Sequence, residues 1–334
     1  MRAVLLALSV LAVAASSLCA AGAPGPFHPV PFGPLQWSND TPNPPTTAGL
    51  IGRWQVILVV DIEEGEGKTG KGTSDSFGWN YVKNQATDQR FIPFLITVNG
   101  QPGGRGESDP NSILKAGGPV GMVRAFAGDA SGVLIVVAPD GRIQRLQRHS
   151  GDIGGIRGEM EKQITSATPL VIAPASFPLS CKPALELLRL GNVPGALALA
   201  RKKLGPDGAQ LSKGLQDQAN VLIEAETTRF ASPAGTPSER FIARERLKGM
   251  LEEFPTVPAA AAAVTALKAK PDKELQNETM AWAMLQDYLL QMAKTPAKKS
   301  AMLQQQAIPA IIAKFPGTYG AEVATMIKVA AKLP

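Results

Sequence analysis

One apolar run, residues 54–61 with the sequence WQVILVVD, constrains the fold of this chain more than any other segment. The run is rich in β-branched residues, and polar and apolar positions do not alternate along it. A strand with one face in water alternates, whereas a strand covered on both faces reads as a nearly continuous apolar run. We therefore expect Trp54 to Asp61 to form a central strand in a layered structure.

Further segments extend this prediction from residue 50 to residue 170. The turn Pro139–Gly141 should join two strands, because proline presets φ and glycine accepts positive φ. The expected order is β-α-β-α-β-β-α, which implies parallel pairing closed by an antiparallel hairpin. After the first strand we expect a helix at about 73–85, a strand at 91–98 weakened by Pro93, a Gly-rich insertion at 100–118, a short helix at 119–126, hairpin strands at 132–138 and 142–146, and a helix at 152–165.

Strand signals stop after Pro174, and apolar residues then recur with the period of a helix. The chain from 178 to 334 should therefore be an all-α domain. The first two helices should be joined at Gly191-Asn192. We expect helices at 179–190, 194–204, 209–231, 237–253, 258–268, 272–293, 297–314 and 319–332.

This helical part contains an internal repeat. Matching sets of apolar residues begin at Phe241 and, 61 residues later, at Met302, and they end in Phe254-Pro255 and Phe315-Pro316. A spacing of three to four residues places each set on one helix face. The residue before proline is pushed out of the α region, so each helix should end there. The repeat predicts two units, each of two helices plus a short one, that bury their apolar faces against neighbours.

The N-terminal residues predict export. Residues 1–23 resemble a secretory signal peptide, with Arg2, an apolar run and small residues near the expected cleavage site. Leu18 stands where a small residue should precede a lipid-attachment cysteine, so we expect no lipid anchor at Cys19. Residues 24–49 are rich in proline and should form an extended arm. We predict a periplasmic or extracellular protein that is soluble after cleavage.

The strand order resembles the thioredoxin-like fold of exported bacterial thioredoxin-domain proteins. Residues 54–61 match the strand before the active-site loop, and residues 132–146 (GVLIVVAPDGRIQRL) match the final hairpin. The resemblance implies a Cys-x-x-Cys after Asp61 and a cis-proline before the hairpin. This chain has no cysteine between Gly22 and Ser180, and Ser131-Gly132 stands in the place of the proline. Disulfide exchange needs a thiolate, so the redox chemistry of the family does not carry over.

The helical domain is similar to tetratricopeptide-type repeats. The match covers one helix pair, and the 61-residue units are longer than an ordinary repeat. This resemblance implies a surface for another protein or peptide. The matching small and apolar residues around the inter-helix turn are Ala184, Leu187, Gly191, Asn192 and Ala196.

The end of the first strand and the loop after it carry four acidic residues that are candidate site residues. They could collect Ca²⁺ through carboxylate oxygens, although the full calcium-loop pattern is absent and a solvated charged loop is the alternative. Residues 65–70 match G-x-G-x-x-G, but the first glycine follows the strand too late for a tight turn, so we expect no nucleotide and no other cofactor. The acidic candidates are Asp61, Glu63, Glu64 and Glu66.

The sequence contains few residues that could act as a nucleophile or bind a metal ion. The chain has two histidines and two cysteines, so no zinc set can form. Cys181 with His149 is a conceivable nucleophile pair, and a buried structural thiol at a helix start is the alternative. The net charge of +6 is spread along helices without interleaved aromatics, which argues against nucleic acid.

The sequence favours a non-catalytic exported scaffold for protein–protein interaction in the cell envelope. The missing Cys-x-x-Cys argues against redox catalysis, although it leaves other enzymatic activity open. The alternative is a thiol-disulfide oxidoreductase relative that acts through Cys181 or through the cysteines of a partner. A third reading is a structural protein of the envelope that binds no specific ligand.

Overall fold

A computed structural model describes residues 35–37, 45–61, 90–98, 114–117, 121–130, 132–149, 177–269 and 271–334. The predicted signal peptide, Cys19 and most of the predicted arm lie outside these residues. So do the helices expected at about 73–85 and 152–165, the glycine pattern at 65–70, and the three glutamates of the acidic loop.

A mixed sheet lies at the centre of the molecule, with strands in the order β1-β4-β3-β2-β5-β6. β2 runs parallel to β3 and antiparallel to β5, and β5 and β6 form the predicted antiparallel hairpin. Every residue of β2 is buried, so the central strand predicted from its continuous apolar run is confirmed. The strands are β1 (Gln36–Trp37), β2 (Trp54–Asp61), β3 (Phe91–Val98), β4 (Leu114–Gly117), β5 (Gly132–Val137) and β6 (Ile143–Arg148).

Two strands differ from the sequence prediction. β4 lies in the Gly-rich segment that we expected to be an insertion, and it pairs parallel to β3 and antiparallel to β1. β1 belongs to the predicted extended arm and occupies a sheet edge, the position that a proline-rich segment can take. β3 continues through Pro93, which precedes the first described β3–β4 pair, Phe94 with Leu114.

The described chain after residue 177 is mainly helical, as predicted. The short helix α2 lies at the end of the predicted extended arm, so the arm prediction is wrong there; no proline interrupts residues 46–50. The bounds expected at 237–253, 258–268 and 297–314 are the observed ones. Proline stands in the first turn of α7 through α11, where its missing N–H costs no hydrogen bond. The helices are α2 (Thr47–Leu50), α5 (Met122–Ala127), the 3-10 helix η5 (Leu179–Cys181), α7 (Lys182–Arg189), α8 (Val193–Lys203), α9 (Gly205–Ala231), α10 (Pro237–Glu253), α11 (Pro258–Lys268), α12 (Lys273–Lys294), α13 (Ala297–Lys314) and α14 (Tyr319–Ala330).

The internal repeat is confirmed in the backbone. α10 ends at Phe254 with φ −129° and ψ 56°, and α13 ends at Phe315 with φ −131° and ψ 54°. Each phenylalanine N–H donates to the carbonyl four residues earlier, on Met250 and Ile311. A short helix follows each turn, so α9–α11 and α12–α14 are two copies of one three-helix unit. The predicted apolar faces are not equivalent at every position, because Phe241 is buried whereas Met302, its counterpart in the repeat, is exposed.

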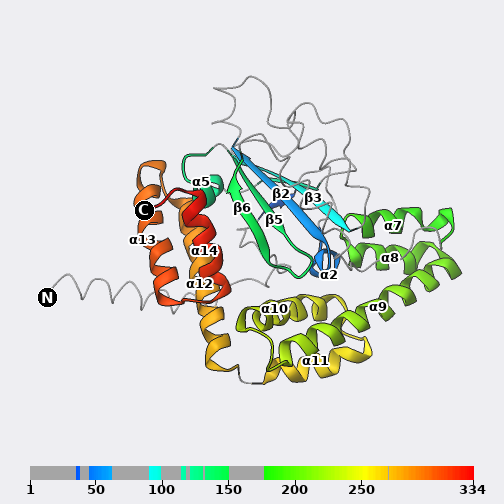
Figure 1. Cartoon of the computed structure of the whole chain (residues 1–334). Coiled ribbons are helices and arrows are strands. Elements are labelled where there is room, and N and C mark those ends of the chain that lie inside the picture. Colours follow the sequence, from blue (N-terminus) through cyan, green and yellow to red (C-terminus); the bar gives the residue numbers. More distant parts are fainter. Residues whose placement is uncertain are drawn as a thin grey trace.

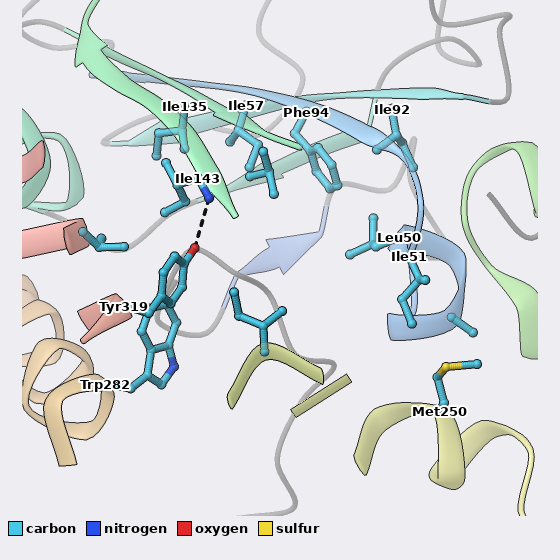
Figure 2. Packing of buried hydrophobic residues seen from close by; sticks show 14 of the residues in the cluster. Leu50, Ile51, Ile57, Ile92, Phe94, Ile135, Ile143, Met250, Trp282 and Tyr319 are labelled. Atoms are coloured by element: carbon cyan, nitrogen blue, oxygen red, sulfur yellow. Dashed lines mark hydrogen bonds between the residues drawn. The ribbon is translucent and has the colours of Figure 1, made fainter. Parts of the chain in front are cut away.

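The helices follow a curved path around the sheet, from α7 and α8 on one side, through α9 to α11, to α12–α14 on the other (Figure 1). One sheet face, with Ile57, Phe94 and Ile135, joins α2, α5 and the surrounding helices in a single buried apolar cluster (Figure 2). The opposite face, with Val56 and Leu134, belongs to a second buried cluster. The two regions predicted as separate domains therefore share one core.

Buried polar groups fix the helices to the sheet at particular points. The Arg53 guanidinium is buried and donates to the carbonyls of Leu188 and Arg189, both at 2.7 Å, at the end of α7. Burial, with the nearby positive charge of Arg189, lowers the pKa of Arg53 to about 10, so it stays charged at neutral pH. Arg246 of α10 pairs with Glu226 at 2.9 Å and donates to Pro139 O in the hairpin turn at 2.7 Å.

Tyr319 supplies a further link, because its hydroxyl oxygen accepts a hydrogen bond from the N–H of Ile143 at 3.1 Å (Figure 2). The Tyr319→Phe substitution removes this hydroxyl and leaves the buried N–H of Ile143 without an acceptor. We therefore expect the free energy of unfolding to fall by about 1–3 kcal/mol. Tyr288→Phe is the matched control, since the carbonyl of Ala125 also accepts from Gln304. Urea denaturation should rank Tyr319→Phe as the more damaging change, and the reverse order would contradict this role.

A close backbone approach between Gly49 and Gly191 gives a second prediction. A Cβ on Gly49 would lie 1.8 Å from the oxygen of Gly191, so Gly49→Ala forces α2 away from the α7–α8 turn. We expect a loss of about 3 kcal/mol or more by equilibrium urea denaturation. Gly235→Ala is the control, because its Cβ would meet only ordinary contacts at 3.5 Å. Equal losses in the two variants would show that the approach is not tight.

Candidate functional site

The carboxyl end of β2 is the position that the sequence singled out for a site. The sheet register places Asp61 opposite Val98 of β3 and Val60 opposite Gly132 of β5. The chain therefore brings the start of the hairpin beside the end of the first strand, as the predicted order required. Asp61 itself is buried, with 4% of its surface exposed.

His149 also lies at this end of the sheet, because its N–H donates to the carbonyl of Gly132 at 3.0 Å. A Cβ on Gly132 would lie 3.2 Å from the Cβ of His149, so the glycine leaves room for the histidine. Both ring nitrogens of His149 are buried and have no hydrogen-bond partner among the described residues. Burial lowers the pKa of His149, so the ring is neutral at pH 7.

From the sequence, His149 was predicted only as a possible partner for Cys181, and its place beside Gly132 was not predicted. The signal was available in the hairpin: residues 132 and 149 are equally far from the centre of the turn at Asp140-Gly141. A regular antiparallel register about that turn brings the two residues opposite each other. The structure shifts the register only between Val136 and Val137, close to the turn.

The acidic candidates are only partly placed. Asp61 ends β2, whereas Glu63, Glu64 and Glu66 lie outside the described residues. Among the residues that the structure describes, no three His, Cys, Asp or Glu side chains gather closely enough to hold a metal ion. The calcium hypothesis for this loop therefore stays a prediction.

Cys181 is fully buried at the end of η5 and belongs to the cluster that joins the sheet to the helices. Within the described residues, which include Cys181, neither ring nitrogen of His149 has a hydrogen-bond partner, so the two residues do not form the nucleophile pair considered from the sequence. A thiolate nucleophile needs access to its substrate and an environment that stabilises its charge. The apolar surroundings of Cys181 provide neither.

Comparisons with protein-family models, with curated proteins and with solved structures gave no match to this chain. The geometry of the site therefore has to carry the functional argument. Of the helices in the described ranges, none combines the length and the apolar character needed to cross a membrane.

The burial of Cys181 predicts slow thiol chemistry. In a Cys19→Ser protein, where Cys181 is the only thiol, we expect almost no reaction with Ellman's reagent in the native state. After denaturation one equivalent should react, because unfolding exposes the sulfur. Absorbance of the released thionitrobenzoate measures both states. Rapid reaction of one equivalent in the native protein would contradict the burial.

Proposed function

We propose that this protein is an exported, non-catalytic scaffold that binds another protein in the cell envelope. In this proposal a thioredoxin-like domain without its Cys-x-x-Cys and a tetratricopeptide-like helical domain act together as one rigid unit. Asp61 ends the strand that precedes the active-site loop in the family. The order β3-β2-β5-β6, with one parallel and two antiparallel pairings, supports the thioredoxin-like part.

The shared core is the observation that carries the proposal. Residues of β2, β3 and β5 lie in the same buried cluster as residues of α8 through α14. Solenoid repeats often bind ligands on a concave side, but here the sheet occupies the inner side of the helical path (Figure 1). A protein partner of the helices must therefore contact their outer faces.

The helices carry exposed apolar side chains that could take part in such a contact. Val221 of α9, Met302 of α13 and Val329 of α14 have 62%, 58% and 74% of their surface exposed. Single exposed apolar residues are common on proteins, so these three define where to probe and do not by themselves mark a site.

The alternative function, thiol-disulfide exchange through Cys181, has less support. A sulfur with no exposed surface cannot be attacked by, or attack, the disulfide of another protein without local unfolding. The alternative can also act through the cysteines of a partner, in which case Cys181 is not needed. An activity measurement distinguishes this form of the alternative from the scaffold.

A crosslinking experiment tests the scaffold directly. A photoreactive amino acid placed at Met302 or Val329 should give a discrete adduct with one envelope protein in cells. The same residue at Gln305, also exposed on α13, shows whether the contact extends around that helix. No adduct from any outer position would favour the structural reading without a specific partner.

Activity measurements provide a second test of the scaffold proposal. The purified protein should not accelerate insulin reduction or dithiol oxidation, and Cys181→Ser should not change adduct formation at Met302. Catalysis by protein whose Cys181 is blocked would overturn the non-catalytic proposal.

A further inference from the structure

α2 lies between two parts of the helical path that are far apart in sequence. Leu50 and Ile51 lie beneath the sheet residues and face Met250 of α10 (Figure 2). At the other end of α2, the N–H of Thr46 donates to the carbonyl of Gly191 in the α7–α8 turn at 2.9 Å. This short segment therefore connects the α7–α8 turn with the end of α10.

Glu253, the last residue of α10, binds the start of α2. Its Oε1 accepts from the N–H of Ala48 at 3.0 Å, and its Oε2 lies 2.7 Å from the hydroxyl of Thr46. The same hydroxyl oxygen lies 3.3 Å from the carbonyl oxygen of Gly191. Thr46 Oγ1 is thus placed between two acceptors on different helical elements.

A threonine hydroxyl has one hydrogen, so it can donate to only one of these acceptors at a time. When Glu253 is ionised, its carboxylate accepts the hydrogen bond from the Thr46 hydroxyl, which then cannot donate to the carbonyl of Gly191. When Glu253 is protonated, its O–H can donate to Thr46 Oγ1, and the Thr46 hydrogen is free for the carbonyl of Gly191.

We propose that a proton on Glu253 completes a hydrogen-bond chain from α10 through Thr46 to the α7–α8 turn, so that acidification tightens α2 against both. The proton balance is simple, because one proton is taken from solvent by the carboxylate and the Thr46 hydrogen only changes its acceptor. The proposal is independent of whether the protein binds a partner.

Burial and a neighbouring like charge favour the neutral acid over the ionised one. Glu252 adds a like charge from α10, and neither α2 (Thr47–Leu50) nor the α7–α8 turn (Leu190–Asn192) contains a charged side chain. Of the two arginines near that turn, Arg53 donates to carbonyls of α7 and Arg189 pairs with Glu186. The carboxyl of Glu253 therefore has no basic partner from these elements.

The direction of the pH effect follows from burial. Desolvation raises the pKa of Glu253 from 4.5 to about 6, against the opposing effect of its hydrogen-bond donors, Thr46 first. A carboxyl group whose pKa is higher in the docked state makes its full contribution to docking below its ordinary pKa of 4.5. That contribution is lost as the pH rises through about 6. Docking of α2 should accordingly be about tenfold weaker at pH 7 than at pH 5.

Amide hydrogen exchange tests this inference. We expect the protection factors of Thr46 and Ala48, corrected for the intrinsic rate, to fall about tenfold from pH 5 to pH 7. Glu253→Gln imitates the neutral acid, since its amide can accept from Ala48 and donate to Thr46, so its protection should stay high at both pH values. Glu252→Gln removes the neighbouring charge but not the chain, so it should keep most of the pH dependence.

Equal protection of the wild-type protein at the two pH values would overturn the proposal, and so would the same slope in Glu253→Gln. If Glu253→Gln does not fold, the ¹³C chemical shift of the Glu253 carboxyl carbon in the wild-type protein decides the question. Its titration midpoint should lie above 4.5, and a midpoint at or below that value would refute the chain.

Discussion

The structure depends on the burial of one sheet face beneath α2, α5 and the helical repeats. That face carries Ile57, Phe94 and Ile135, which would expose a large apolar surface without the helices. The helical units have the same need, because an isolated repeat cannot bury its own apolar face. Each region supplies the cover that the other lacks, which explains why the boundary between them in sequence is not a boundary in the core.

Polar contacts then fix where the helices lie on that apolar surface. Glu278 of α12 is fully buried, and it accepts from Ser238 of α10 at 2.8 Å and from the N–H of Tyr319 at 2.8 Å. Its carboxylate thus joins the start of α10 to the start of α14, across the two repeat units. Burial raises the pKa of Glu278, which shows that desolvation outweighs its two donors. Burying a charged group need not add net stability, but its two hydrogen bonds hold α10, α12 and α14 in register with one another.

The shared core also limits what the protein can do. Cys181 is held inside it, and the inner side of the helical path is filled by the sheet. The shared core therefore argues against reaction through the Cys181 thiol. It also argues against ligand binding in a concave groove of the helices. Within the part of the chain that the structure describes, the buried polar groups of Asp61 and His149 at the end of the sheet and the exposed faces of the helices are the places that keep functional potential.

The sequence by itself determined most of the elements, but not β1, β4 or α2. The apolar run of β2, the turn at Pro139–Gly141 and the Phe-Pro ends of the repeat are local patterns, and local physics decides such patterns. The contacts between elements, in contrast, are made by residues that lie far apart in the sequence. The role of Arg53, the position of His149 beside Gly132 and the burial of Cys181 depend on residues far along the chain. Only the tertiary structure decided that the sheet fills the helical path, because periodicity shows that a face is apolar but not what covers it.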